Sequence, residues 1–496
     1  MSATTARSSQ PPVSFDPQLR RLALVVVVGA IMTILDTTIV NVAITTLGRE
    51  WDTSLSTIQW VLTGYTLALS MTIPLTSWAI ARFGAKHVWL ASLTLFVLGS
   101  VFCGLAWSVS SLIAFRAVQG FGAGLVLPVG QTMLARAAGP ARMGRVMAVI
   151  AVPAMLAPVL GPVVGGVIVD NVDWRWLFFV NVPISAVAIG LAVRLLPSDT
   201  ERDRRARIDL LGLALLSPGL AALVYGLSEA GNGAGAGSPR VWGFLAAGAL
   251  LVGAFAVRAL RRPDTALVDL RVFRIRPFSV ATTALFTYSA GVFGLVVLLP
   301  LYLQLVRGDS PLDAGLLIAP WGIGAMLTMP LSGRVTDRGG PRGVALAGVA
   351  VALAGAFVYP AVQADTPRWL LTAGVFVIGL GHGLIVPALS GGMYRGVSHA
   401  EVPAATTAGN IVARVGSSLG VAVLAVVLQS EIRERIPGAS GSLSELAGLP
   451  RTAEVATSIT DAFAHSFWWV VGIVALSLVP VALMPGRAVA GDADAR

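Results

Sequence analysis

Two charged residues lie inside long apolar stretches of the sequence, where charges are rare. Asp36 is the only acidic residue deep within such a stretch, and Arg116 lies several residues inside another. A charge at membrane depth is costly, so such residues are functional candidates by default. A buried carboxylate tuned by a nearby cation can bind a proton on one side of a membrane and release it on the other. We therefore predict proton coupling by Asp36, for which the alternative is a structural ion pair. For Arg116 the alternative to a role inside the protein is a side chain that reaches the outer surface.

The composition indicates which elements must hold these residues. The 496-residue chain is 55% hydrophobic and 12% charged, with a formal net charge of +10, whereas soluble domains contain about 25% charged residues. We therefore expect a polytopic membrane protein and no nucleic-acid partner, because the basic residues fall in short loops between apolar segments. Cys103 is the only cysteine, which excludes an internal disulfide. We expect no metal, no cofactor and no enzymatic activity.

The apolar segments predict an all-α fold that crosses the membrane fourteen times, since about 20 apolar residues suffice for one crossing. Lys and Arg number 25 in the segments on one side and 8 on the other, which places both termini in the cytoplasm. The predicted parts are a cytoplasmic tail at 1–21, a six-helix bundle at 22–196, two inserted helices with charged flanks at 197–276, a second six-helix bundle at 277–485 with an outer loop at 431–462, and a tail at 486–496.

Two pairs of similar segments suggest an internal duplication. Gly120–Pro128 matches Gly379–Pro387 at an offset of 259 residues, and Ser77–Gly84 matches Gly333–Gly340 at an offset of 256. Abundant glycine could produce either match by chance, but two matches at nearly one offset favour two related six-helix halves.

A glycine-rich string, Gly161, Pro162, Gly165 and Gly166, lies in the fifth apolar segment. Small residues four apart let another helix pack closely, and the proline weakens the helix. The aromatic stretch Trp174–Pro183 follows and is typical of an interfacial anchor. The string resembles the antiporter signature of major facilitator exporters, and the aromatic stretch resembles their fourteen-helix drug:proton branch.

This resemblance covers nearly the whole chain and implies further roles. Asp36 and Asn41 match the helix 1 motif, and Arg116 matches the helix 4 arginine that faces the cavity and is implicated in proton transfer. The antiporter string is expected to form a tight contact between the two halves. An inner-loop motif that latches neighbouring helices is matched by Gly333, Asp337, Arg338 and Gly340; the first-half copy keeps Arg82 and Gly84 but has Ser77 and Ala81 where glycine and aspartate are expected. A charge latch is therefore expected mainly on Asp337 and Arg338.

Substrate contacts are predicted from aromatic and polar residues in the apolar segments, because amphipathic aromatic pockets bind flat or cationic apolar ligands. The alternatives are lipid-facing aromatics, a structural histidine and an arginine that reaches the interface. The predicted residues are Asn41, Trp60, Tyr65, Gln119, Phe286, Tyr302, Gln304, Trp321, His382 and Arg414.

The residues and the resemblance together predict a proton-coupled antiporter that exports small apolar or amphipathic compounds by alternating access. The alternative is an exporter or flippase of lipid-like cargo with the same fold. The expected partners are a small-molecule substrate, protons and the lipid bilayer. We expect a monomer in the cytoplasmic membrane of a prokaryote.

Overall fold

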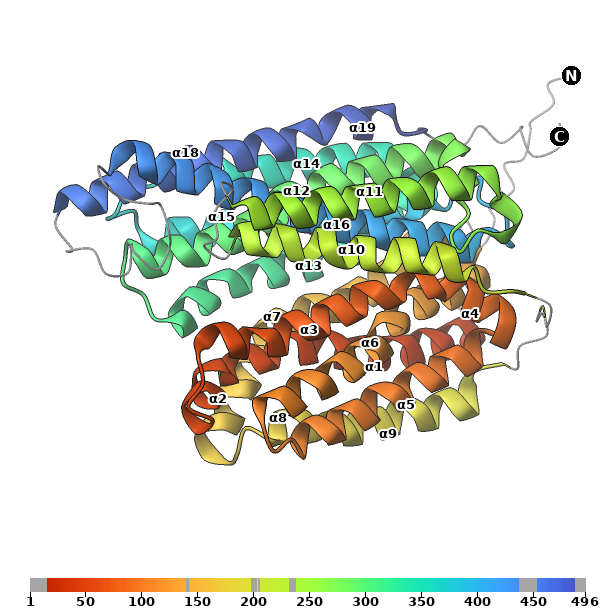
Figure 1. The fold of residues 1–496 in the computed structure, drawn as a ribbon. Coiled ribbons are helices and arrows are strands. Elements are labelled where there is room, and N and C mark those ends of the chain that lie inside the picture. Colours follow the sequence, from red (N-terminus) through yellow and green to blue (C-terminus); the bar gives the residue numbers. More distant parts are fainter. Residues whose placement is uncertain are drawn as a thin grey trace, which may run out of the picture.

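The computed structural model describes residues 16–139, 142–197, 203, 206–231, 238–436 and 453–486. In this part of the chain the secondary structure is helical, and the long helices run side by side in two bundles (Figure 1). The predicted all-α polytopic fold is confirmed. Most of both predicted tails (1–15 and 487–496) and residues 437–452 of the predicted outer loop lie outside the described residues.

The first half of the chain forms one bundle, in which the long helices alternate in direction. α1 begins at the end of the molecule where α19 ends, which we call the terminal end; the opposite end is the distal end (Figure 1). The elements are α1 (Pro17–Ile39), η1 (Val40–Ala43), α2 (Ile44–Glu50), α3 (Leu55–Thr72), η2 (Ile73–Leu75), α4 (Thr76–Phe83), α5 (Ala85–Gly104), α6 (Val109–Ala138), α7 (Met143–Asn171), α8 (Trp176–Phe179) and α9 (Asn181–Leu195).

The second bundle follows a pair of inserted helices. The inserted elements are α10 (Leu210–Gly231) and α11 (Pro239–Arg261), followed by the short η4 (Pro263–Thr265) and η5 (Leu270–Arg274). The second half consists of α12 (Arg276–Leu305), α13 (Pro311–Gly339), α14 (Pro341–Ala356), η6 (Tyr359–Ala361), α15 (Arg368–Met393), α16 (Val402–Arg435), α18 (Ala453–Leu476) and α19 (Leu478–Leu483). α16 and α18 both extend into the segment expected to be the outer loop 431–462.

Twelve helical stretches among the described residues are long and apolar enough to cross a membrane. α3 and α7, which lie where the second and fifth spans are predicted, are not among these twelve. The predicted number of fourteen is therefore not confirmed and stays a prediction. Both ends of the described chain lie at the terminal end (Figure 1).

The ends of equivalent helices agree with the predicted duplication. Ser54 caps α3 and Ser310 caps α13, each accepting a hydrogen bond from a backbone N–H in the first turn. Such a cap satisfies one of the free N–H groups at the start of a helix. α4 ends at Gly84 and α13 ends at Gly340, with φ angles of 86° and 91°. Glycine adopts these angles without steric cost, which explains its presence in both copies.

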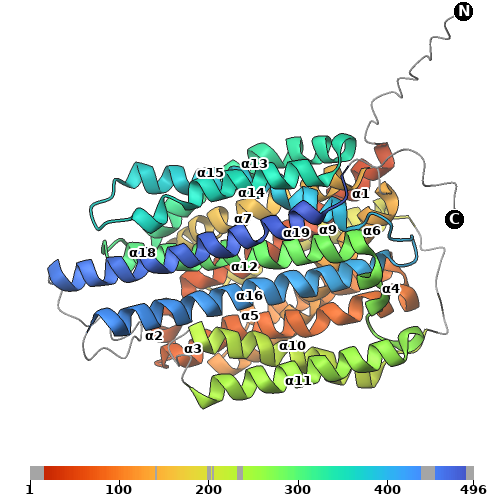
Figure 2. The same ribbon diagram turned by 90° about the horizontal axis from the view of Figure 1, so that it is seen from above.

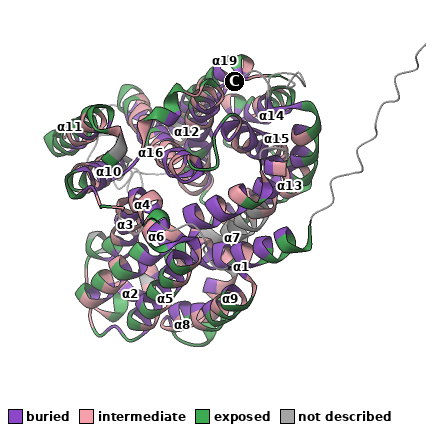
Figure 3. Ribbon diagram, turned by 90° about the vertical axis from the view of Figure 1, so that its right-hand side faces the viewer, coloured by how far each residue is buried: buried purple, intermediate pink, exposed green. Residues whose placement is uncertain are grey.

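The inserted pair lies at the edge of the molecule (Figures 2 and 3). α10 packs against α3 of the first half and α16 of the second, and α11 packs on α10. Arg258 of α11 and Asp209, directly before α10, form an ion pair of 2.7 Å. Burial raises the pKa of Asp209, but hydrogen bonds from Arg258 and the Gly212 N–H outweigh it, so the pKa is lowered. This pair fixes the two inserted helices to each other at the terminal end.

Large apolar side chains are exposed on the outside of the bundles. Leu327 on α13 is 64% exposed and Leu250 on α11 is 74% exposed, and exposed residues follow the outer helix faces in Figure 3. Backbone polar groups are satisfied within each helix, so such surfaces suit the hydrocarbon of a bilayer. The described helices are therefore those of a multi-pass membrane protein.

Candidate functional site

Asp36 lies inside the first bundle, with its side chain completely shielded from solvent. Its carboxylate accepts hydrogen bonds from Arg116 Nη1 at 2.6 Å, Gln119 Nε2 at 2.9 Å and Asn181 Nδ2 at 2.8 Å. Asp36 and Arg116 are both 0% exposed. Three helices, α1, α6 and α9, thus converge on one carboxylate.

Arg116 is held by groups on three sides. Besides Asp36, its Nη1 donates to Gln119 Oε1 at 2.7 Å, and its Nε donates to the Val61 carbonyl at 3.3 Å. The centre of its guanidinium lies 3.9 Å from the centroid of the Tyr65 ring, a cation–π contact. Its Nη2 has no hydrogen-bond partner among the described residues. Arg116 therefore points inward to Asp36, and does not reach the outer surface.

Asn181 and Ser100 complete the site and were not predicted from the sequence. Asn181 Nδ2 bonds to Ser100 Oγ at 3.1 Å as well as to Asp36, and its Oδ1 is buried without a partner among the described residues. α5 approaches α6 closely here because Gly99 has no side chain; a Cβ there would lie 2.7 Å from the Gln119 backbone. Asn181 is a polar residue in the mainly aromatic and apolar stretch Trp174–Pro183. This position is the feature of the sequence that could have indicated a buried polar contact.

This arrangement holds a carboxylate and a guanidinium together away from solvent. Two charges buried together cost solvation energy, which their attraction offsets only when further hydrogen bonds satisfy them. Gln119 and Asn181 supply these bonds to Asp36. Protonation of the carboxylate would remove the ion pair and change how α1 is held against α6 and α9.

The glycine string packs within the first half. A Cβ at Gly161 would overlap the Thr38 side chain, 2.7 Å from its Cβ, and one at Gly165 would lie 2.9 Å from the Ile39 carbonyl. A Cβ at Gly166 would meet no described atom within 4 Å, and the side chain of Pro162 lies outside the described residues. The expected contact between the halves is therefore wrong for Gly161 and Gly165: they let α7 approach α1 directly after Asp36.

α7 instead contacts α13 of the second half along its first part, from Gly144 to Met155. Asp337 of α13 accepts hydrogen bonds from Arg145 Nε at 2.9 Å and from the Gly144 N–H at 3.0 Å. Gly333 lies against the same turn, since a Cβ there would be 2.8 Å from the Arg145 Cα. Burial lowers the pKa of nearby Arg395, although the Asp337 carboxylate acts to raise it. A charge contact between the halves thus rests on Asp337, with Arg145 as a partner that was not predicted.

The other predicted latch residues have different positions. Arg338 is exposed at the end of α13 and has no described ion pair. Arg82 is partly buried, and in the first-half motif Ser77 carries the contact, with its Oγ 3.0 Å from Thr407 Oγ1 of α16. Gly84 and Gly340 end their helices and carry no contact of this kind. The second-half copy of the motif therefore contacts the other half through a charged pair, and the first-half copy contacts it through two neutral hydroxyl groups.

The predicted substrate residues lie on helices of both halves. Tyr65 and Gln119 belong to the Asp36 site. Tyr302 is buried in the second bundle and donates to the Gln363 carbonyl at 2.8 Å. The remaining positions are as follows: Trp60 stacks on Tyr225 at 5.5 Å, Phe286 contacts Gly416, Asn41 is exposed, and Gln304 and Arg414 are partly exposed.

Trp321 and His382 are brought together inside the second bundle. Their ring centroids are 4.8 Å apart, and the Tyr288 hydroxyl lies 3.2 Å from His382 Nδ1. All three side chains are buried. A hydrogen-bonded structural histidine, the alternative weighed from the sequence, fits this geometry.

Two related bundles of apolar helices, with a buried ion pair in one of them, define a membrane transporter of two halves. The chain belongs to the Major Facilitator Superfamily, whose family model matches residues 26–421. It is 35% identical over 493 residues to a multidrug resistance protein B homolog of Mycobacterium tuberculosis, covering 96% of this chain and 90% of that protein. It is 30% identical over 444 residues to the tetracenomycin C resistance and export protein of Streptomyces glaucescens, covering 88% and 81%.

A solved structure supports the fold independently. The crystal structure of the human organic anion transporter MFSD10 matches with a TM-score of 0.62 at 17% identity, covering 92% of this chain and 100% of that one. At this identity the likeness concerns the fold alone. The predicted major facilitator fold is confirmed.

Proposed function

We propose that this protein exports small apolar or amphipathic compounds in exchange for protons, with Asp36 as the proton carrier. The observation that carries the proposal is the fully buried Asp36–Arg116 pair at membrane depth. The names of the relatives from M. tuberculosis and S. glaucescens, which refer to multidrug resistance and to antibiotic export, support the class of cargo.

The contacts suggest how a proton could drive the change of conformation. Protonation of Asp36 removes the charge that holds Arg116, so the packing of α1 against α6 changes. α1 touches α7 where Thr38 meets Gly161, and the other part of α7 carries Arg145 at the contact between the halves. A movement of α1 is thus transmitted along a single helix, α7, to the contact that must open.

The available energy is sufficient for export. One proton that moves through 100 mV supplies about 2.3 kcal/mol, and each pH unit adds about 1.4 kcal/mol. One or two protons per cycle would therefore sustain a large concentration gradient of cargo.

The same proposal includes the orientation of the protein. We place the terminal end in the cytoplasm of a prokaryotic cell, because the segments on that side carry 25 of the 35 basic residues. The latch between Arg145 and Asp337 then closes the cytoplasmic side. We expect the monomer to be sufficient, since the proton site lies within one bundle.

The decisive experiment compares Asp36→Asn with the wild type in proteoliposomes that contain ethidium. The amide keeps the shape of the carboxylate but cannot carry a proton in the working pH range. We expect proton-gradient-driven ethidium transport to fall at least about tenfold, which corresponds to about 1.4 kcal/mol. Ethidium exchange without a gradient should persist, because it needs no net proton movement.

The matched control is Asp461→Asn, which removes an exposed carboxylate on α18. It should leave gradient-driven transport unchanged. Undiminished coupled transport by Asp36→Asn would exclude Asp36 as the proton carrier.

A further inference from the structure

α10, the first of the two inserted helices, is attached to α3 of the first half at two places. Toward the terminal end, Ser217 Oγ donates to the Met71 carbonyl at 2.6 Å. Toward the distal end, the Trp60 and Tyr225 rings stack with their centroids 5.5 Å apart. The two helices therefore run in opposite directions, and the segments between these contacts face each other.

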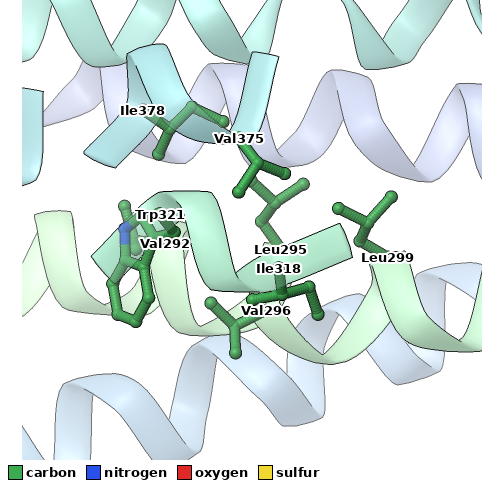
Figure 4. A pocket seen from close by; sticks show the side chains of 8 residues that line it. All are labelled: Val292, Leu295, Val296, Leu299, Ile318, Trp321, Val375 and Ile378. Atoms are coloured by element: carbon green, nitrogen blue, oxygen red, sulfur yellow. The ribbon is translucent and has the colours of Figure 1, made fainter. Parts of the chain in front are cut away.

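A cavity of about 300 Å³ lies next to the distal contact, between α3, α10 and the start of α2. A cavity of about 150 Å³ holds one benzene ring, so this one has room for a compound of about two rings. The apolar hollow between α12, α13 and α15 of the second half (Figure 4) has only about 10 Å³, room for about one water molecule. Of these two spaces, only the one beside α10 can hold a small molecule.

The lining of this cavity combines polar and apolar side chains. α3 contributes Gln59, Thr63 and Thr66, which are spaced three and four residues apart and so lie on one face of the helix. Tyr225 and its neighbour on α10 are buried, whereas the lining residues of α2 and α3 are partly or fully exposed, so the cavity is accessible. The apolar part of the lining consists of Ile44, Leu62, Leu67 and Val224.

The polar groups of the α3 face are free to meet a ligand. The side chains of Gln59, Thr63 and Thr66 make no hydrogen bond to any described residue. Ser70 and Thr72 of the same helix instead donate to carbonyls of the preceding turn. Hydroxyl and amide groups both donate and accept hydrogen bonds, and none of the three is charged. They therefore suit the hydroxyl and carbonyl oxygens of a neutral compound.

Tyr225 is the aromatic residue of the lining, and its neighbours fix its ring. Besides the stacking on Trp60, Phe244 of α11 packs edge-on against it with the centroids 4.7 Å apart. Arg240 Nη2 donates to the Tyr225 hydroxyl at 2.8 Å. A wall that is already ordered loses little entropy when a ligand packs against it, which favours binding.

The cavity also lies between elements that belong to different parts of the molecule. α10 and α11 pack on α16 of the second half through a buried apolar cluster of Leu227, Val241 and Ala422. A compound in the cavity thus touches α3 of the first half and an inserted helix that is packed on the second. A movement of the halves relative to each other would change the shape of the cavity, as a site that takes up and releases a ligand requires.

We propose that this cavity between α3 and α10 binds a neutral amphipathic compound of about two rings that carries hydroxyl or carbonyl oxygens along one edge. The oxygens meet Gln59, Thr63 and Thr66, and the rings pack on the apolar lining and Tyr225. The inserted pair then has a binding role. That the compound is cargo rests on the proposed export function, whereas its binding rests on the geometry of the cavity.

Photolabelling in lipid nanodiscs tests this binding without any transport step. The probe is 4-(hydroxymethyl)benzophenone, a neutral compound with two rings, a carbonyl and a hydroxyl, and adducts are located by mass spectrometry. We expect adducts on Leu62, Leu67 and Val224. Leu250, which is 74% exposed on α11, reports labelling from the lipid and serves as the internal standard. Val126, 0% exposed in the core of the first half, reports the background.

Filling the cavity should remove the signal. Thr66→Phe and Val224→Phe fill it from α3 and α10, and each should lower adducts on the remaining lining residues at least about tenfold relative to Leu250, because a filled space excludes the rings. The two variants arise on different helices, so misfolding of one leaves the other informative. Val257→Phe makes the same enlargement at an exposed position of α11 and should leave labelling unchanged.

The polar wall is tested by a change that keeps its shape. Thr63→Val and Thr66→Val each replace a hydroxyl by a methyl group of similar size. The double substitution should weaken labelling of Leu62 and Val224 about two- to tenfold relative to Leu250, as expected when hydrogen bonds to the probe are lost.

Two results would overturn the proposal. One is wild-type labelling of the cavity no stronger than that of Val126; the other is labelling that neither Thr66→Phe nor Val224→Phe reduces. Both are independent of the proton gradient, so they are distinguishable from a failure of Asp36→Asn to impair export. The cargo role further requires that gradient-driven export of the same probe from proteoliposomes fall at least about tenfold in both filling variants. Unimpaired export in these variants would retain the binding site and reject its occupant as cargo.

Discussion

The two ends of α7 make contacts of opposite character. Near its start, Arg145 forms an ion pair with Asp337 of the other half, with side-chain exposures of 20% and 3%. Farther along, Gly161 packs on the Thr38 side chain and Gly165 packs on the Ile39 carbonyl, both on α1 of their own half. The first contact is directional and partly hydrated; the second is dry and depends on shape.

This difference suggests that the two ends of α7 behave differently. The end with Gly161 and Gly165 stays packed on α1 and is called the fixed end; the end with Arg145 can separate from Asp337 and is called the releasable end. An ion pair at a partly exposed interface contributes little net stability and can be broken and remade during a cycle. A separation of about 0.5–1 Å already loses a quarter to a half of the van der Waals attraction at a close contact, so close glycine packing favours movement of α7 together with α1. The helix extends over 29 residues, or about 43 Å, long enough to connect the Asp36 region with the contact between the halves.

The largest effect is expected at the fixed end. Gly161→Ala places a Cβ in the space of the Thr38 side chain, and overpacking of this kind costs about 1–3 kcal/mol. We expect a lower melting temperature in detergent and proton-driven transport that is slower than in the wild type. Thermal unfolding and ethidium transport in proteoliposomes measure the two effects.

Gly166→Ala is the matched control for this substitution. It lies in the same helix, but a Cβ there meets no described atom within 4 Å. The melting temperature in detergent and the rate of proton-driven transport should both stay near those of the wild type. Equal damage by the two substitutions would mean that helix flexibility, rather than contact with Thr38, explains the glycines.

A smaller effect is expected at the releasable end. Asp337→Asn removes the charge partner of Arg145 but keeps an oxygen for the Gly144 N–H. The substitution should destabilise the state in which the terminal ends of the halves are in contact by about 1–2 kcal/mol relative to the separated state. The unfolding temperature should change little. A population of molecules with separated terminal ends should therefore increase about tenfold.

Distance measurements between two spin labels can detect this shift. Labels at Ala137→Cys and His399→Cys, two exposed positions at the terminal ends of different halves, are introduced with Cys103→Ser. Arg338→Gln is the control, because Arg338 is exposed at the end of the same helix. A distance distribution that changes as much in Arg338→Gln as in Asp337→Asn would contradict the role of the Arg145 pair.

The sequence predicted those features that follow from local chemistry. The sequence singled out the lone acid Asp36 and the basic residue Arg116 in two apolar segments, because burial of charge has few explanations. The structure pairs these two residues, and their part in proton coupling stays a prediction. The similar segments Ser77–Gly84 and Gly333–Gly340 predicted related halves, and in the structure the last glycine of each segment ends a helix. These inferences needed only the residue type and its surroundings in the chain.

Partners that belong to other helices could not be predicted in this way. Asn181 lies 145 residues from Asp36 and Arg145 lies 192 residues from Asp337, and neither pairing has a local signal. The glycine string showed that α7 packs closely against something, but small residues do not specify which helix approaches. For the same reason the resemblance assigned Gly161 and Gly165 to the contact between the halves, whereas they contact α1.

The smallest effect is expected in the neutral copy of the latch. Ser77→Ala removes the hydroxyl that lies 3.0 Å from Thr407, and a single neutral hydrogen bond contributes about 0.5–1 kcal/mol. The spin-label distances should therefore shift less than in Asp337→Asn, while the unfolding temperature stays nearly the same. Thr407→Val, which removes the partner hydroxyl, should produce an equal shift, and the double substitution should add little to either. A shift as large as that of Asp337→Asn would show that both copies of the motif hold the halves together equally, and that charge is not what distinguishes the releasable end of α7.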